Sequence, residues 1–458
     1  MDAALTYAKR QQDRFLKELF DLLRIPSVSA DPAHDPDTQR AAKCMADLLT
    51  RIGIEHVRLI PTAHNPIVYG DWLHAPGKST ILLYGHYDVQ PPDPLDKWTS
   101  PPFEPTIRDG KIYARGSADN KGQIGAVCYA VESWLKGTGT LPCNVKFFIE
   151  GDEEGGMAGV EAVAKYPHEV ACDAVVISDA HWIDREHPAI FYGMKGLCMM
   201  DVAVRGPNRD VHSGTFGNLL ANPLNVLAHL LGQMCPPNAP IQIPGFYEDI
   251  AEPAPAERAL LAEAPFDTAD LKREYGVDAI GVGEPQFSPL ERNWLRPTMD
   301  ICGMWGGYQG PGGKTIIPSE AYAKVSFRIV PNQDPQKIAA AFERHFRALC
   351  PKGVTVVRCA LLGGAEAALT PYDDPFLQAA LKALAVATGK RALLAREPAS
   401  IPISVNFRKY AKAPVLLFGM GYIDNDIHSP NEHLESDQFA QGIVTYIHVL
   451  QAMGAVRK

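Results

Sequence analysis

Histidines and carboxylates recur in this chain directly after short apolar runs, a placement that can build a metal site. Four runs of strand length show it, at residues 81–85, 145–149, 174–178 and 415–420. In an open α/β sheet the carboxyl ends of parallel strands meet at one crevice, where ligands bind. Because clustered carboxylates repel one another unless cations neutralise them, the pattern predicts bound divalent ions. The residues that follow the runs are His86, Asp88, Glu153, Glu154, Asp179 and, one loop later, His428.

Asp119 completes the predicted ligand set. It lies in a Gly-flanked turn at residues 116–122, ahead of a predicted helix, so its backbone can approach a site closely. Two imidazoles and three carboxylates suit two zinc ions, or manganese, and do not suggest a thiolate site. Three carboxylates and a bridging hydroxide balance the charge of two divalent ions. The predicted metal ligands are His86, Asp119, Glu154, Asp179 and His428.

Two further residues of the cluster have predicted roles beside the ligands. Glu153 is not needed as a ligand, and we expect it to be the general base for the metal-bound water. Asp88 can hold the second N–H of the His86 imidazole and fix its tautomer. Taken singly, each residue has a structural explanation, such as a helix cap or a loop histidine, but agreement at four strand ends favours chemistry. Four histidines lack this context and are taken as structural: His64, His74, His181 and His433.

Composition narrows the class of protein. The chain has 458 residues, a formal net charge of −9 and no basic stripe, which argues against a nucleic-acid partner. Its nine cysteines contain no CxxC pair, which favours reduced thiols in the cytoplasm. The N-terminus has no signal-peptide pattern, and no apolar run reaches about 18 residues, so we expect no membrane span.

The same runs imply the elements that must position these side chains. Buried strands alternate with helical patterns, which predicts an α/β domain with a mostly parallel central sheet. After Gly196 the pattern changes to strand-like alternation, which predicts an inserted α+β sandwich. A Pro- and Glu-rich stretch at 235–300 reads as a long irregular insertion. The predicted helices are 5–24, 39–52, 122–135, 160–165, 222–234, 335–349 and 376–388, and the predicted strands of the insert are 197–204 and 321–329.

The motif series of the chain resembles the dinuclear-zinc metallopeptidases that include aminoacylase, carboxypeptidase G and carnosinase. It is most similar to the carnosinase-type cytosolic dipeptidases from Tyr84 to Gly122, which reads YGHYDVQPPDPLDKWTSPPFEPTIRDGKIYARGSADNKG. The likeness continues, in the family's order, through FFIEGDEEGG, SDAHW, VHSGTFGN, GGYQGPGGKTIIP, FRIVPNQDP, SIPIS and IHSPNE.

This resemblance assigns roles and bounds. It implies a zinc-peptidase-like catalytic domain at 1–196 and 368–458, with a lid and dimerisation domain at 197–367. Asp119 would bridge both metals, with a non-proline cis peptide bond after it. Glu154 and His428 would complete one site, and His86 and Asp179 the other.

The resemblance also assigns the substrate contacts. His212 matches a histidine that reaches the partner subunit's active site and stabilises the oxyanion. Arg328 matches the arginine that holds the substrate's free carboxylate. Thr315 and Ser400 match polar residues on the substrate's C-terminal side. Read without the resemblance, these four are a loop histidine, a lid-strand arginine paired with a surface acid, and two turn hydroxyls.

The predicted function is that of a homodimeric hydrolase that cleaves the peptide bond of dipeptides, using a metal-bridging hydroxide and Glu153 as general base. The alternative is a deacylase of N-acyl amino acids on the same dinuclear site. A non-catalytic scaffold would not need Glu153. The insertion with Asp96, Lys97 and Trp98 favours the dipeptidase branch. The loop before Ser400 has Pro398 and Ala399 where the family usually has two glycines, and Asn218 replaces a common glycine. Both changes lie where the substrate should bind, so the exact substrate stays open.

Overall fold

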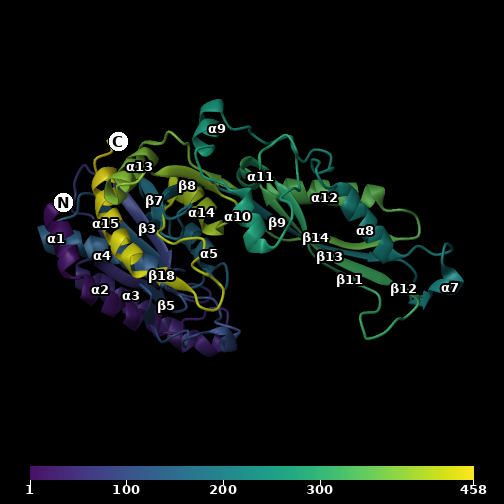
Figure 1. The fold of residues 1–458 in the computed structure, drawn as a ribbon, viewed down its shortest axis with the longest axis horizontal. Coiled ribbons are helices and arrows are strands. Elements are labelled where there is room, and N and C mark those ends of the chain that lie inside the picture. Colours follow the sequence, from purple (N-terminus) through teal and green to yellow (C-terminus); the bar gives the residue numbers. More distant parts are fainter. Residues whose placement is uncertain (458) are drawn as a thin grey trace.

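The computed structural model describes residues 1–457 and shows two lobes side by side (Figure 1). The larger lobe, which holds both chain ends, is built on a nine-stranded sheet in the order β1-β2-β6-β3-β7-β17-β8-β15, with β16 also paired to β8. The strands are β1 (Glu55–Ile60), β2 (Ile67–Trp72), β3 (Thr80–His86), β6 (Asn144–Glu150), β7 (Ala174–Ile177), β8 (Ala189–Met194), β15 (Ala368–Leu369), β16 (Leu393–Glu397) and β17 (Val415–Leu417).

The centre of this sheet is parallel, as the apolar runs predict. β3 lies between β6 and β7 and is parallel to both, and β17 is parallel to β7. Helices cover both faces, so side chains of β3 are buried whichever way they point. The helices of the larger lobe are α1 (Asp2–Arg10), α2 (Gln12–Leu23), α3 (Asp35–Ile52), α4 (Lys121–Thr138), α5 (Ala158–Lys165), α6 (Pro167–Val170), α13 (Pro375–Thr388), α14 (Pro402–Ala411) and α15 (Ser436–Met453).

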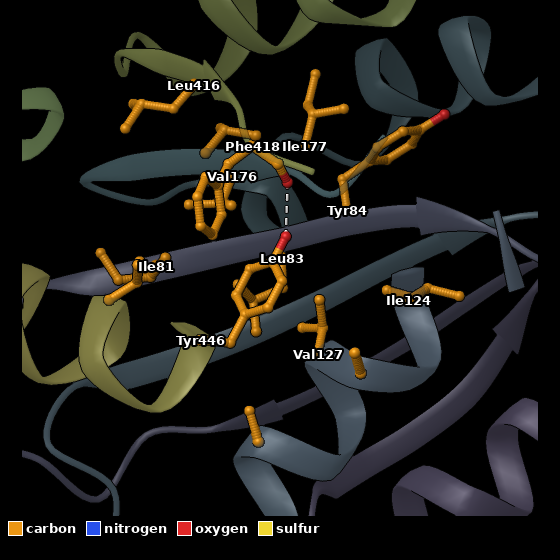
Figure 2. Close-up of a cluster of buried hydrophobic side chains, with 14 of the residues drawn as sticks. Ile81, Leu83, Tyr84, Ile124, Val127, Val176, Ile177, Leu416, Phe418 and Tyr446 are labelled. Atoms are coloured by element: carbon orange, nitrogen blue, oxygen red, sulfur yellow. Dashed lines mark hydrogen bonds between the residues drawn. The ribbon is translucent and has the colours of Figure 1, made fainter. Parts of the chain in front are cut away.

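Side chains of β3 alternate between two helical layers. Leu83 lies near Val127 of α4 and Tyr446 of α15 (Figure 2). The Tyr446 hydroxyl is buried and donates to the Phe418 carbonyl oxygen at 2.7 Å. Tyr84 points the other way and meets the Phe407 ring of α14 edge-on. This packing fixes the carboxyl end of β3, where His86 stands.

The smaller lobe is an antiparallel sheet with two helices on one face. Its strand order is β11-β13-β9-β14, and α8 and α12 pack on it. A short ribbon, β10 with β12, and the one-turn α7 lie at the end farthest from the larger lobe (Figure 1). The bounds are β9 (Gly196–Arg205), β10 (Val211–His212), β11 (Thr298–Gly306), β12 (Ile316–Ile317), β13 (Glu320–Ile329), β14 (Thr355–Ala365), α7 (Ser213–Phe216), α8 (Pro223–Met234) and α12 (Pro335–Leu349).

The larger sheet and the smaller sheet are connected at two points of the chain. Lys195 joins β8 of the larger sheet to β9 of the smaller one, and residues 366–367 lead from β14 back to β15. These crossings support the domain bounds 1–196, 197–367 and 368–458, which remain a proposal. A third, small sheet consists of β4 (Thr106–Arg108), β5 (Lys111–Tyr113) and β18 (His433–Glu435), and two short 3₁₀ turns are η1 (Pro32–His34) and η2 (Leu95–Lys97).

Two local predictions were wrong. The helix expected over 5–24 is interrupted at Gln11 (φ −104°, ψ 4°), and the break lets both α1 and α2 pack on α4. The 235–300 stretch, expected to be irregular, contains α9 (Pro255–Leu261), α10 (Thr268–Tyr275) and α11 (Pro289–Leu295). Leu261 and Trp294 of this stretch pack into the core of the larger lobe, and that tertiary contact organises helices too short to show in the sequence.

The fold class is confirmed: an α/β lobe with a mostly parallel sheet and an inserted α+β lobe. Among residues 1–457, no helix is long and apolar enough to cross a membrane.

Candidate metal centre

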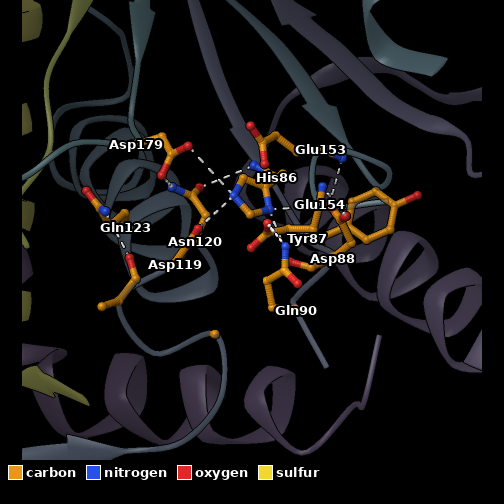
Figure 3. A network of polar contacts seen from close by, with 12 residues as sticks. His86, Tyr87, Asp88, Gln90, Asp119, Asn120, Gln123, Glu153, Glu154 and Asp179 are labelled. Atoms are coloured by element: carbon orange, nitrogen blue, oxygen red, sulfur yellow. Dashed lines mark hydrogen bonds and ion pairs between the residues drawn. The ribbon is translucent and has the colours of Figure 1, made fainter. Parts of the chain in front are cut away.

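The larger sheet and the adjoining loops bring the predicted ligands to one place. His86 is the last residue of β3, and Asp179 comes two residues after β7. Glu154 lies four residues past β6, and Asp119 lies in the turn before α4. These side chains face one another across the end of the sheet (Figure 3). His428 reaches the same cluster from the loop between β17 and β18.

Among residues 1–457, three groups of donor atoms lie close enough to hold an ion; one is His86, Glu153 and Glu154, and the other two share Asp119. Of these two, one is His86, Asp119 and Asp179, and the other is Asp119, Glu154 and His428; within each, the ligand atoms lie within 4.8 Å of one another. His86 Nε2 is 3.0 Å from Asp119 Oδ1, and His428 Nε2 is 2.9 Å from Asp119 Oδ2. One carboxylate therefore presents one oxygen to each imidazole, which is the arrangement a bridging ligand needs.

The electrostatics of the cluster favour a cation. Burial raises the pKa of Asp179 to about 7, and the Asp119 charge adds to the rise. Burial likewise raises the pKa of Glu153. The hydrogen bond to Asp119, and then the Glu154 carboxylate nearby, raise the pKa of His428 to about 10. Desolvation disfavours the ionised form of buried carboxyl groups unless a positive charge lies beside them.

The hydrogen bonding of the Glu154 carboxylate indicates that these residues fit a metal ion. Its Oε2 accepts a hydrogen bond from Gln90 Nε2 at 2.7 Å. Its Oε1 is buried and accepts no hydrogen bond from the described residues, with His428 Nε2 3.2 Å away. A buried carboxylate oxygen without a donor is expensive unless a ligand occupies its lone pairs. The donor set of imidazole nitrogen and carboxylate oxygen therefore fits divalent ions such as zinc.

Asp88 is fully buried and holds several parts of the site together. His86 Nδ1 lies 3.1 Å from the Asp88 backbone carbonyl oxygen and 3.3 Å from Asp88 Oδ1. Asp88 Oδ2 accepts hydrogen bonds from Ser29 Oγ at 2.6 Å and from the Glu154 N–H at 3.0 Å. When Nδ1 of His86 donates toward Asp88, Nε2 is left free to act as a ligand.

A second buried acid, which sequence reasoning missed, holds the turn around Asp119. Both oxygens of Glu432 accept hydrogen bonds, from Arg115 Nη1 and from the backbone N–H groups of Gly116, Ala118 and Asp119, at 2.8–3.0 Å. The peptide bond after Asp119 is cis, as the resemblance implies.

Asn120 and Gln90 were also missed. Asn120 Nδ2 donates to Asp179 Oδ1 at 2.9 Å, and Gln90 supports Glu154. The only sequence signal was the position of each residue beside or between motif residues, because amide groups carry no charge pattern.

A cavity of about 370 Å³ opens beside the cluster. Its lining residues include Asp119, Glu153 and Asp179 of the cluster, and also His181 and Glu397. His181 Nε2 lies 3.8 Å from Glu397 Oε2. His181, predicted to be structural, thus stands where a substrate would lie.

The predicted substrate contacts fall in two places. Arg328 on β13 donates through Nη1 to Ser400 Oγ at 3.0 Å, which joins the two lobes next to the cavity. His212 is exposed on β10, in the ribbon at the far end of the smaller lobe (Figure 1). Thr315 is beside it, since the Thr315 carbonyl oxygen accepts from the Ser213 N–H. Within one chain, the structure does not bring His212 and Thr315 to the metal cluster.

Imidazoles and carboxylates gathered at the end of a parallel sheet, beside a cavity, fit the active site of a metal-dependent hydrolase. Comparison with known proteins agrees: residues 82–452 match the family described as Peptidase family M20/M25/M40. The Cys-Gly metallodipeptidase dug1 of Schizosaccharomyces pombe is 31% identical, over 99% of this chain and 99% of its own length.

Solved structures give the same result. Human carnosine dipeptidase 1 superposes with a TM-score of 0.80 at 29% identity, covering 99% of both chains. The M20 family metallo-carboxypeptidase Sso-CP2 from Sulfolobus solfataricus gives a TM-score of 0.85 at 28% identity, covering 96% of this chain and 99% of that one. The chain belongs to the M20/M25/M40 peptidase family, and the resemblance stated from its motifs is confirmed. Members of this family bind divalent metals, and the cluster supplies candidate ligands.

Proposed function

We propose that this protein is a dipeptidase that works with two divalent metal ions and as a homodimer. The observation that carries the proposal is the pair of ligand groups that share Asp119, beside a cavity of small-peptide size. The full-length similarity to a Cys-Gly metallodipeptidase and to a carnosine dipeptidase supports dipeptides as the substrate class.

The residues divide into two ligand sets. His86 and Asp179 would hold one ion, Glu154 and His428 the other, and Asp119 would contact both. Imidazole and carboxylate donors suit zinc first and manganese second. When bound, the ions supply Lewis acidity that polarises the scissile carbonyl and acidifies water.

Glu153 is the proposed proton carrier. It lies next to Glu154 at the wall of the cavity, and its backbone N–H points toward Asp88 Oδ1 at 3.4 Å. Its carboxylate accepts a proton as water oxygen attacks the carbonyl carbon, and returns it to the leaving nitrogen as the C–N bond breaks.

The substrate contacts come from both lobes. Arg328 and Ser400, already in contact, would receive the free carboxylate of the dipeptide. His212 and Thr315 would act on the partner subunit's site, with His212 stabilising the oxyanion. The exposed position of their ribbon, remote from the cluster in the same chain, supports action in trans.

Metal-stripped protein tests the reaction. Zinc or manganese added back should restore hydrolysis of free dipeptides, and Glu153→Ala should bind metal and fold normally but lose turnover by several orders of magnitude. Cleavage of N-acetyl amino acids alone would move the function to deacylase. Metal-independent cleavage, or substantial turnover by Glu153→Ala, would overturn the proposal.

Mixing two inactive variants tests the homodimer. A heterodimer of Glu153→Ala and His212→Ala subunits has one site with both wild-type groups. An equal mixture that exchanges subunits at random should therefore recover about a quarter of wild-type activity. A mixture no more active than its components would show that His212 does not act on a partner's site.

A further inference from the structure

One buried lysine side chain has no hydrogen-bond or ion-pair partner among the described residues. Three lysines in the described part of the chain are buried: Lys121, Lys146 and Lys195. The ammonium groups of Lys121 and Lys146 each donate to two backbone carbonyl oxygens, at 2.6–3.3 Å. Lys195 is 3% exposed, and its ammonium makes no hydrogen bond or ion pair with any residue in 1–457. A cation that keeps so little contact with water and has no protein partner is costly, so such a group points to a ligand.

Arg328 shows the same deficit. The buried guanidinium groups of the chain are paired with carboxylates: Arg115 with Glu432, Arg296 with Glu284, and Arg396 with Glu257. Arg328 is half-buried and, among the described residues, contacts a single hydroxyl, that of Ser400. A guanidinium fork with one neutral acceptor has most of its donors free.

The two cations lie at the same junction. Lys195 is the link between β8 and β9, and Arg328 on β13 is in register with Leu197, two residues further along β9. The Lys195 N–H donates to the Glu397 carbonyl oxygen at 3.1 Å, which places Lys195 beside the strand that lines the cavity. Burial, and then the charge of Arg328, lower the pKa of Lys195 to about 7.

We propose that Lys195 and Arg328 together bind the α-carboxylate of the dipeptide's C-terminal residue. This inference rests on the proposed dipeptidase function and adds Lys195 to it as a specificity residue. A carboxylate has acceptor sites for both cations, and an ammonium point charge complements the planar guanidinium fork. Because Arg328 comes from the smaller lobe and Lys195 from the crossover, the same carboxylate would fix the two lobes relative to each other. Peptides without a free carboxylate would be poor substrates for this reason.

Kinetics of Lys195→Met in the metal-loaded enzyme test this, with L-alanylglycine and L-alanylglycinamide as the pair of substrates. We expect kcat/KM for the acid to fall about 10–100-fold, mostly through KM, with little change for the amide. Lys195→Arg should retain most of the discrimination. Lys324→Met is the matched control, since Lys324 is a lysine of the smaller lobe that pairs with Asp201 at 3.1 Å. An equal loss on both substrates, or no loss, would overturn the assignment.

A binding experiment separates this inference from the proposed reaction. Calorimetric titration of L-alanylglycine into metal-loaded Glu153→Ala enzyme, with and without Lys195→Met, needs no turnover. Binding at least tenfold weaker in the double variant, with the amide unaffected, supports the carboxylate site even if the wild-type enzyme fails to cleave the dipeptide. Equal affinities would refute it, whether or not dipeptides are cleaved.

Discussion

The turn that carries Asp119 is held by the charge of Glu432, an acid that is distant in the sequence but in contact with the turn. This carboxylate is fully buried, and its Oε2 accepts from Arg115 Nη1 and the Gly116 N–H, while its Oε1 accepts from the Ala118 and Asp119 N–H groups. Glu432→Gln keeps the shape but replaces one acceptor by an NH₂ group. Each oxygen of Glu432 accepts from two donors, so in Glu432→Gln two of the four donors face the new NH₂ group and lose their acceptor.

The loss of unfolding free energy in Glu432→Gln can be worked out from these contacts. Hydrogen bonds to charged groups contribute about 1.5–3 kcal/mol each, and breaking a buried ion pair costs about 3–5 kcal/mol. Burial raises the pKa of Glu432 even though Arg115 opposes it, so desolvation offsets part of the attraction. We therefore expect the free energy of unfolding to fall by about 3–5 kcal/mol, rather than by the sum of all four bonds. At about 2.1 cal/mol/K per residue, this lowers the Tm of the 458-residue chain by about 3–5 °C.

Two measurements check the expectation. Calorimetric melting of the metal-free proteins gives the change in Tm, and competition with a chelator gives zinc affinity. Because Glu432 holds a ligand rather than binding metal itself, we expect zinc affinity to fall about 10–100-fold. Glu186→Gln is the control, since that side chain is 74% exposed and pairs with Lys390. A Tm and a zinc affinity both equal to those of the control would refute the reasoning.

Three other expectations concern the same region. Gly122→Ala should weaken zinc binding, because a Cβ there would lie 2.0 Å from the Ser117 carbonyl oxygen; Gly125→Ala, with its nearest atom at 3.8 Å, is the control, and equal zinc affinities would contradict this. The hydrogen bond to Asp152 raises the pKa of His64, so its stabilisation is present below about pH 6.5 and is lost as pH rises through the folded-state pKa. The loss of Tm in His64→Gln should therefore be larger at about pH 5.5 than at about pH 8.5, and a pH-independent loss would contradict it. Removing metal should lower stability by about 2.7 kcal/mol relative to protein held at a hundredfold excess over Kd, which melting with and without chelator would detect.

The parallel core and the convergence of His86, Glu154 and Asp179 could be predicted because both follow from local patterns. Apolar runs of strand length indicate the end of each strand to within a few residues, and parallel strands place their carboxyl ends together. Glu432 could not be found this way. Its partners lie more than 300 positions away in the sequence, at residues 115–119, and only the folded chain brings β18 beside that turn.

The unpredicted break in the first helix and two unpredicted helices of the 235–300 stretch also depend on contacts that are distant in the sequence. The interruption at Gln11 and helix α9 depend on tertiary contacts. Helix α11 also has a local start signal, the capping box of Ser288 and Glu291, which the prediction missed. Lys195 is a further case. A lysine in a sequence is by default exposed, and its burial without a partner becomes visible only when the two sheets and their crossover are placed.

The larger lobe supplies the candidate metal ligands, and the smaller lobe and the link supply the proposed carboxylate contacts. The affinity for zinc and the affinity for the dipeptide should therefore change independently. Every candidate metal ligand, together with Asp88 and Glu432, belongs to the larger lobe, whereas Arg328 comes from the smaller lobe and Lys195 from the link between them. A change at Glu432 therefore acts on metal affinity through a buried network that Lys195 does not join. Lys195→Met should conversely leave zinc affinity at its wild-type value while it weakens dipeptide binding. Sites that share no contacts give additive effects, so the double variant should show both losses independently.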